Sequence, residues 1–148
     1  MVKIFSIKNE YCAKIFDNKK LVELRRQNIK IRENEKCLIY TTHPVKKLTG
    51  YFIVKDKIRL PIKKLWIEIK DIAGITKSQF MDYFQGCIEG TAIFFKYVKK
   101  FINELSLDEM KSLVKGFRPP QSYSNINENI YNLFIKNAGD SVITLSMF

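Results

Sequence analysis

The feature that most constrains the fold is the alternation of short apolar runs with helical segments along the chain. Runs typical of buried or half-buried strands occupy residues 2–7, 21–25, 37–41, 50–55 and 91–101. The segments do not form a series of strand–helix–strand units. Their order therefore predicts an α+β fold, in which a mixed or antiparallel sheet curls into a barrel with flanking helices.

Helices are predicted between and after these runs. Two of them begin at capping boxes, Thr76 with Gln79 and Ser106 with Glu109. The others are expected over residues 8–16, 61–74 and 125–137. The helix that starts at Pro61 has an apolar face that includes Trp66, which we interpret as a core residue. Residues 124–148 are expected to form a C-terminal extension, with a helix and a candidate last strand over 141–148.

The length and composition favour one domain. The chain has 148 residues, of which 46% are hydrophobic and 13% aromatic. A chain of this size buries roughly two-thirds of the surface that it exposes when unfolded. No repeat, low-complexity stretch or long linker interrupts it. We therefore expect residues 1–148 to fold as a single domain.

The positive charge is unevenly distributed. The net charge is +11, and residues 1–100 hold 22 of the 26 Lys and Arg residues but 10 of the 15 acidic ones. Residues 46–64 alone contain seven basic residues and one acidic residue. Such a concentration favours a polyanion as partner. The alternative is a lysine-rich surface that is only solvated, and composition does not separate the two.

The cysteines and the hydropathy indicate a cytoplasmic location. Cys12, Cys37 and Cys87 are odd in number and widely spaced, so we expect buried, reduced thiols. No Cys or His residues have the spacing of metal ligands, and we expect neither a metal nor a cofactor. No run approaches the roughly 20 apolar residues that span a bilayer, so no membrane segment is expected.

Two N-terminal segments carry a family resemblance. They read SIKNEY over residues 6–11 and NKKLVELRR over residues 18–26. They resemble the signature of ASCH domains, in which a first strand ending in a SIKPxY-like turn leads to a helix, and G-x-K-x-x-E-x-R opens the second strand. Lys20, Glu23 and Arg25 match that motif. Asn18 stands where Gly is usual, and Asn tolerates the left-handed conformation better than most residues.

The resemblance extends over much of the chain. Residues 39–44 and 50–54 are similar to the family's paired strands, and residues 74–86 and 119–123 resemble segments of its larger prokaryotic members. The matching segments occur in the same order over residues 6–123. The resemblance implies a PUA-like mixed β-barrel with flanking helices, and a ligand-binding cleft between the barrel and the first helix.

A basic cluster is the candidate site. Glu23 and Arg25 share one face of a strand, where a carboxylate can orient a guanidinium. Lys20 precedes that strand and Lys8 follows the first one, so both could join the cluster. Such a set could bind a phosphate and read a base edge. The alternatives are an ion pair that only pins the strand, and a Lys20 that is merely solvated.

Hydroxyl and aromatic side chains are further candidates. Thr41, Thr42 and Ser122 could donate hydroxyl hydrogen bonds to a ligand, or serve only in turns and loops. Tyr40 and Tyr83 could stack on a base, although the helical spacing of Tyr83 favours the core.

The only histidine, His43, lies at a strand end before Pro44. It is a candidate general base, and a turn residue is the favoured interpretation.

These features predict an RNA- or nucleotide-binding protein, which the family resemblance extends to regulation of transcription or translation. The alternative is a hydrolase that acts on RNA or on an acylated nucleoside, with Lys20 and Glu23 in the active site. In the amidohydrolase branch of the family the motif lysine is paired with a threonine three residues on. Glu23 stands at that position here.

Overall fold

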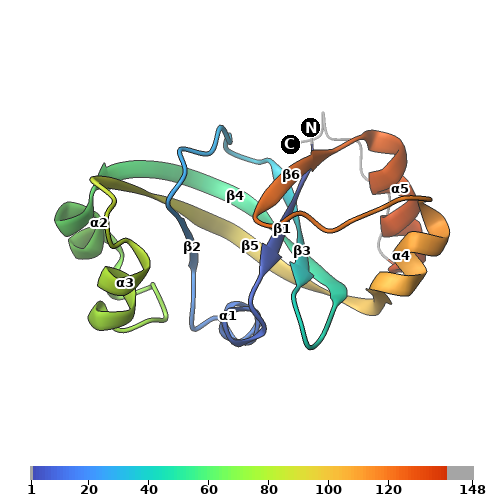
Figure 1. Cartoon of the computed structure of the whole chain (residues 1–148), viewed down its shortest axis with the longest axis horizontal. Helices are drawn as coiled ribbons and strands as arrows, with labels where there is room; N and C mark the ends of the chain where they lie inside the picture. The colour runs from blue at the N-terminus through green and yellow to red at the C-terminus, as the bar shows by residue number, and fades with distance from the viewer. Residues whose placement is uncertain (1, 140–148) are drawn as a thin grey trace.

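The computed structural model describes residues 2–139, and its strands and helices alternate in the predicted way (Figure 1). The elements are β1 (Val2–Ile7), α1 (Asn9–Phe16), β2 (Val22–Arg25), β3 (Lys36–Thr41), β4 (Lys47–Pro61), α2 (Ile62–Ile69), α3 (Lys77–Tyr83), β5 (Glu89–Ser106), α4 (Leu107–Leu113), β6 (Tyr123–Ile126) and α5 (Glu128–Asn137). Both predicted capping boxes are formed, by Thr76 with Gln79 at α3 and by Ser106 with Glu109 at α4.

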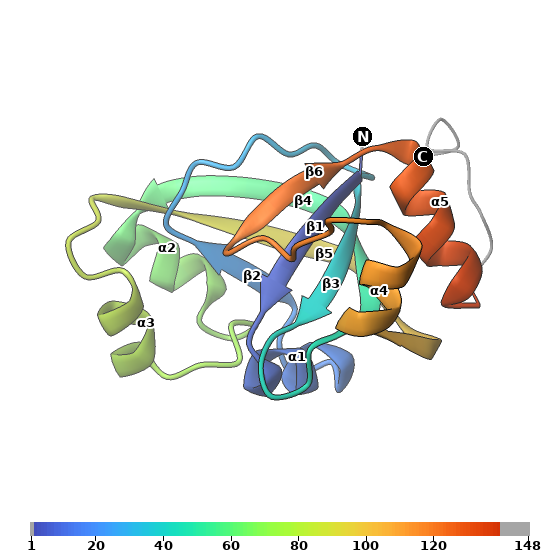
Figure 2. The ribbon, with the colours of Figure 1, turned by 45° about the vertical axis from the view of Figure 1, so that its right-hand side comes forward.

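The strands form one mixed sheet. Their order is β2-β5-β4-β3-β1-β6, with β1 and β3 parallel and the other neighbouring pairs antiparallel. Figure 2 shows β1 between β3 and β6, and α1 below the ends of β1 and β3. The predicted α+β class is therefore confirmed. Within residues 2–139 the sheet is not closed into a barrel by backbone pairing, because β2 and β6 are its edges.

Two strands are much longer than predicted. β4 has 15 residues and β5 has 18, and they pair along nearly their whole length. The prediction missed residues 56–61 and 102–106 because polar and charged residues interrupt the apolar pattern there, while backbone hydrogen bonds continue the ladder. The two strands run across the molecule, with α2 and α3 at one end and α4 and α5 at the other (Figure 1).

The core has three clusters, one for each group of helices. The first packs α4 and α5 on the sheet, and it includes Phe101, Leu105, Met110, Tyr131 and Phe134. The second lies under α1 and includes Phe5, Ile15, Ile39, Phe52 and Ile93. The third lies under α2 and α3 and includes Leu65, Ile69, Phe80 and Phe84. Trp66 is half-buried against Phe80, with ring centroids 5.0 Å apart, which agrees with its predicted core role.

A buried cation lies in the first cluster. Lys36 is fully buried, and its ammonium lies 3.9 Å from the ring centroid of Tyr51 and 5.2 Å from that of Tyr131. Such cation–π contacts stabilise a desolvated ammonium. They connect β3 and β4 with α5.

The C-terminal part differs from the prediction. The helix expected over residues 125–137 begins at Glu128, after Asn127, whose side chain accepts a hydrogen bond from the Ile130 amide. Residues 123–126 instead form β6, because they pair with the open edge of β1. The candidate strand over residues 141–148 lies outside the described residues.

Three further predictions concern membranes, cysteines and metals. No helix of the described chain is long and apolar enough to cross a bilayer. The cysteines are free thiols; Cys12 and Cys37 are buried as expected, but Cys87 is only half-buried. Within residues 2–139 no three His, Cys, Asp or Glu side chains gather where they could hold a metal ion.

Candidate functional site

A cavity of about 290 Å³ opens where the end of β1, the start of α1, β2 and the end of α3 meet, and we call it the central cavity. Its lining residues are Ser6, Ile7, Lys8, Tyr11, Glu23, Leu24, Arg25, Thr42, Tyr83 and Gln121. Lys8 is the extended residue before α1, and its carbonyl accepts hydrogen bonds from the Tyr11 and Cys12 amides. This turn places Lys8 and Tyr11 on the same cavity.

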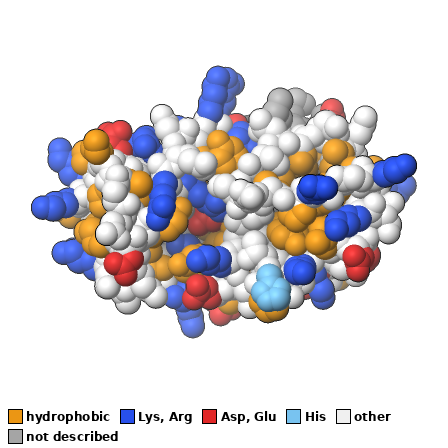
Figure 3. Space-filling model, in the orientation of Figure 1, with side chains coloured by type: hydrophobic (Ala, Val, Ile, Leu, Met, Phe, Trp, Pro, Cys, Tyr) orange, Lys and Arg blue, Asp and Glu red, His pale blue; other side chains and the backbone are white. Residues whose placement is uncertain are grey.

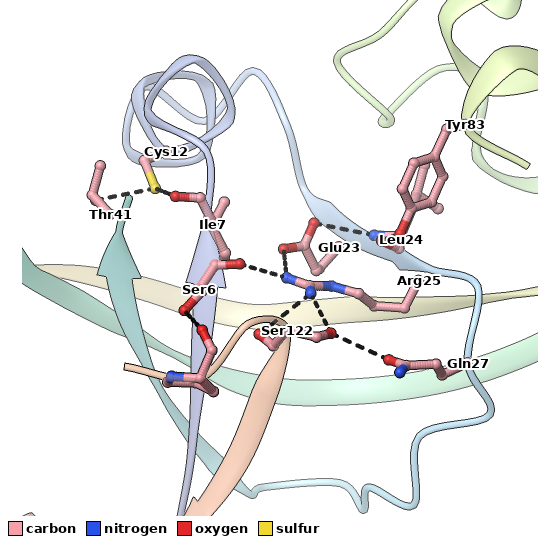
Figure 4. A network of polar contacts seen from close by, with 11 residues as sticks. Ser6, Ile7, Cys12, Glu23, Leu24, Arg25, Gln27, Thr41, Tyr83 and Ser122 are labelled. Carbon is pink, nitrogen blue, oxygen red and sulfur yellow. Dashed lines mark hydrogen bonds and ion pairs between the residues drawn. The ribbon is translucent and has the colours of Figure 1, made fainter. Parts of the chain in front are cut away.

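Arg25 lies at the centre of a hydrogen-bond network (Figure 4). Its Nη1 donates to Ser122 Oγ at 2.9 Å and to the Ser122 carbonyl at 3.4 Å. Its Nη2 donates to the Ser6 carbonyl at 3.1 Å and to Glu23 Oε2 at 3.0 Å. The guanidinium also lies 5.1 Å from the ring centroid of Phe5. Arg25 thus connects the edge strand β2 with β1 and with the segment before β6.

These bonds engage the Arg25 guanidinium with protein atoms. Its side chain is 11% exposed, and four of its hydrogen bonds already go to protein atoms. We conclude that it holds the cavity wall together and positions Glu23. This corresponds to the structural alternative considered for the Glu23–Arg25 pair.

Glu23 is the buried acid of the cavity. Its side chain is 5% exposed, and its Oε1 accepts a hydrogen bond from the Leu24 amide at 3.2 Å. Its Oε2 accepts from Arg25. Each carboxylate oxygen has a second lone pair, so Glu23 can still accept a hydrogen bond from a ligand N–H or O–H group.

Lys20 is neither solvated nor at the mouth of the cavity. It is buried behind Tyr11, and its Nζ donates to the Ala73 carbonyl at 2.9 Å and lies 5.3 Å from the Tyr11 ring centroid. Gly74 makes this possible, because a Cβ there would lie 2.8 Å from the Lys20 Cβ. Burial lowers the pKa of Lys20 from 10.5, and the Glu23 carboxylate partly offsets that effect.

The three predicted hydroxyl residues have different positions. Thr42 lines the cavity. Ser122 accepts a hydrogen bond from Arg25 and donates one to Gln27 Oε1 at 3.2 Å, so it supports the wall. Thr41 is buried away from the cavity, where its hydroxyl bonds to Thr49 and to the Cys12 sulfur. Successive strand residues face opposite sides, which explains why Thr41 points into the core.

Tyrosines form the aromatic walls, but they are not the expected pair. Tyr40 is buried in the first core cluster and cannot stack on a ligand. Tyr83, expected in the core, is 36% exposed, and its hydroxyl donates to the Leu24 carbonyl at 3.1 Å. Tyr11 of α1 also lines the cavity. Burial raises the pKa of Tyr11 and that of Tyr83 above 10.0, so both are neutral phenols at physiological pH.

The remaining candidates lie elsewhere. His43 is exposed in the turn between β3 and β4 and does not line the cavity. The basic residues of 46–64 are spread along β4 and α2, and none of them lines it. Lys and Arg side chains occur over much of the face shown in Figure 3. Gln121 lines the cavity and was missed, because only its place before Ser122 could have suggested it.

Comparison with known proteins shows which proteins the chain resembles. No family model matches the chain. A curated protein of Zymomonas mobilis, named ASCH domain-containing ribonuclease, is 29% identical over 119 residues, which are 80% of each chain. The crystal structure of ASCH from Z. mobilis has a TM-score of 0.86 and 25% identity, with 91% of this chain and 94% of that one covered.

In sequence and in fold the chain is similar to ASCH domain proteins. The resemblance of residues 6–11 and 18–26 to the ASCH signature is thereby confirmed. The ASCH fold is also related to the N-terminal domain of Staphylothermus marinus McrB, with a TM-score of 0.58 and 12% identity over 91% of this chain and 93% of that one. At that identity the likeness concerns the fold alone.

Replacement of Arg25 should destabilise the fold. Arg25→Ala should lower the free energy of unfolding by about 3–5 kcal/mol, because it leaves the Glu23 carboxylate buried without its cation. Arg25→Lys should restore only part of the loss, since an ammonium cannot reproduce the guanidinium fork. Urea unfolding measures both. Arg26→Ala, at the exposed next position, is the control and should cost less than about 1 kcal/mol; equal losses at 25 and 26 would contradict the assignment.

Lys20 should titrate below 10.5. The unfolded chain then binds more protons than the folded one between the two pKa values, so this group makes stability rise with pH in that window. NMR of ¹³C-labelled lysine, with the Lys20 resonance assigned from Lys20→Arg, measures the pKa. Glu23→Gln should lower it further, because the carboxylate favours the ammonium. A Lys20 pKa at or above 10.5 would refute the buried position.

Proposed function

We propose that this ASCH-domain protein binds single-stranded RNA by accepting one unpaired nucleotide in the central cavity. The observation that carries the proposal is the position of the buried Glu23 carboxylate in a hollow bordered by Tyr11 and Tyr83. Tyrosine rings stack on unpaired bases, and a carboxylate accepts hydrogen bonds from base N–H groups. The Z. mobilis relative, whose name states that it is a ribonuclease, supports RNA as the ligand class.

The size of the cavity favours a single nucleotide. Its volume of about 290 Å³ is near the lower end of small-molecule sites, which begin at roughly 300 Å³. A base pair within a duplex could not enter it. The ligand is therefore an unpaired residue of a loop or single strand, or a free nucleotide of the same chemistry.

The polar groups of the cavity contact different parts of the nucleotide. Lys8 is exposed and lines the cavity, so its ammonium can contact a phosphate. Glu23 can accept from a base edge, and Thr42 and Gln121 supply further polar groups. The net charge of +11 would draw an RNA chain toward this surface and make binding weaken as salt rises.

A role in regulating transcription or translation and a cytoplasmic location are two further proposals. Regulation of transcription or translation would require that the bound RNA be a transcript or part of the translation machinery. A cytoplasmic location is consistent with the free thiols of Cys12, Cys37 and Cys87.

Binding by cavity variants tests the proposal. Tyr83→Ala should weaken binding of a fluorescent eight-nucleotide single-stranded RNA by about 5- to 150-fold, because one base loses its stacking partner. Lys8→Ala should make the salt dependence shallower by about 0.7 in log Kd against log salt, since one phosphate contact is lost.

Fluorescence anisotropy at several salt concentrations measures both effects. Lys111→Ala, an equal charge loss on the exposed face of α4, is the matched control. If Tyr83→Ala and Lys8→Ala bind as Lys111→Ala does, the central cavity is not the binding site.

Hydrolysis is the second candidate, and the name of the relative favours it. Glu23 could take the proton of a ribose 2′-hydroxyl as that oxygen attacks the adjacent phosphorus. The 5′-oxygen of the next nucleotide would leave and take a proton from the Lys8 ammonium. Lys20, which does not line the cavity, would act electrostatically from behind Tyr11.

Cleavage by this route should leave a 2′,3′-cyclic phosphate. Glu23→Gln should reduce the rate by about 100-fold or more, while RNA binding persists. Mass spectrometry of the products, with acylated nucleosides in the substrate panel, measures this. A 2′-deoxy substitution at the cleaved nucleotide is the control and should block the reaction. No turnover by the unaltered protein on RNA or on acylated nucleosides would leave binding as the function.

A further inference from the structure

A second hollow lies beside Arg26, the residue that follows Arg25. This distal cavity, of about 380 Å³, is lined by Arg26, Arg59, Gly86, Cys87, Ile88 and Glu89. Arg26 connects the two sites, because its guanidinium lies 5.0 Å from the ring centroid of Tyr83 and its Nε donates to the Tyr83 carbonyl. Tyr83 thus lines the central cavity and contacts a residue of the distal one.

The two neighbouring arginines contact different groups. Arg25, the last residue of β2, bonds to Glu23, Ser6 and Ser122. Arg26 follows the end of β2 and lies against the Tyr83 ring at the end of α3. Arg26 is exposed, whereas Arg25 is nearly buried.

Arg59 is held in place before any ligand binds. Its Nη1 donates to the Arg26 carbonyl at 3.1 Å and to Thr91 Oγ1 at 2.7 Å, and its Nε lies 3.6 Å from Glu89 Oε1. Its side chain is still 25% exposed. A guanidinium fixed in this way loses little conformational freedom when it binds an anion.

The surroundings of the two guanidinium groups suit a nucleotide. Two cations line this cavity and one partly exposed carboxylate opposes them, so an additional anion reduces their repulsion. The planar guanidinium fork matches phosphate oxygens. Ile88 is 87% exposed beside them and offers an apolar surface to a base. Apart from its chain neighbours, no atom lies within 4 Å of where a Cβ of Gly86 would stand, so there is open space next to it.

We propose that the distal cavity is a second nucleotide subsite, so that single-stranded RNA crosses Tyr83 with one nucleotide in each cavity. Arg26 and Arg59 bind the phosphate of the second nucleotide, and its base lies over Ile88. This inference rests on the proposed function, because it requires that the first nucleotide occupies the central cavity.

Two ligands of different length test the subsite. Isothermal titration calorimetry compares nucleoside monophosphates with an eight-nucleotide single-stranded RNA of mixed sequence. Arg26→Ala and Ile88→Glu are the variants; the second introduces a carboxylate at an exposed position and leaves the arginines and their partners unaltered. Both should weaken binding of the octamer by about tenfold. Ile88→Glu should leave mononucleotide binding unchanged, and Arg26→Ala should weaken it less than octamer binding, because Arg26 also contacts Tyr83. Lys111→Ala, at the opposite end of the molecule, should change neither.

The outcomes separate the two hypotheses. If both variants bind the octamer as tightly as the unaltered protein, while Tyr83→Ala still weakens mononucleotide binding, the distal subsite is refuted and the proposed function stands. If Arg26→Ala and Ile88→Glu weaken mononucleotides as much as the octamer, the two cavities are not separate subsites and this inference fails. If the unaltered protein binds neither ligand, the proposed function fails, and the subsite fails with it.

Discussion

The Glu23–Arg25 ion pair is the contact on which the site depends. It lies on the edge strand β2, and the same guanidinium reaches the Ser6 carbonyl of β1 and both oxygen atoms of Ser122. The backbone leaves the sheet open at β2, and this one side chain spans the gap to β1 and to the segment before β6. The bridge also fixes the carboxylate of Glu23 in the central cavity, so one interaction both joins the strands and positions the buried acid.

Some basic residues near the cavity are bonded to protein atoms, and others are exposed to solvent. Arg25 and Lys20 are both basic residues of the ASCH signature, yet their polar atoms are bonded to the protein, Arg25 in the cavity wall and Lys20 to the Ala73 carbonyl. Lys8, just before α1, and Arg26, beside the signature arginine, are exposed. The exposed cations therefore lie next to the strongest motif positions, which are themselves used to build the wall.

Local patterns predicted much of the fold, since β1, α1 and both capping boxes depend on residues close together in the chain. The strand face shared by Glu23 and Arg25 was predicted for the same reason. The predictions that were wrong concern residues whose positions depend on contacts with residues far away in the chain. Lys20 is buried because the chain at Gly74 packs on it, and residues 123–126 form a strand because β1 offers them an edge. Tyr83 lies on a helical face whose spacing is typical of the core, but in the folded chain that residue lines the central cavity.

The Ser6–Arg25–Ser122 network has a consequence for synthesis on the ribosome. The three residues are far apart in the chain: Ser6 bonds to the Pro120 carbonyl 114 residues away, and Arg25 to Ser122 97 residues away. Contacts of such long sequence separation form late and slow the folding of a domain. While the segment around Ser122 is still inside the ribosomal exit tunnel, Arg25 of the nascent chain lacks its hydrogen bonds to Ser122. The Glu23–Arg25 ion pair is then not yet packed against the segment before β6. The wall of the central cavity is therefore one of the last parts of the fold to form.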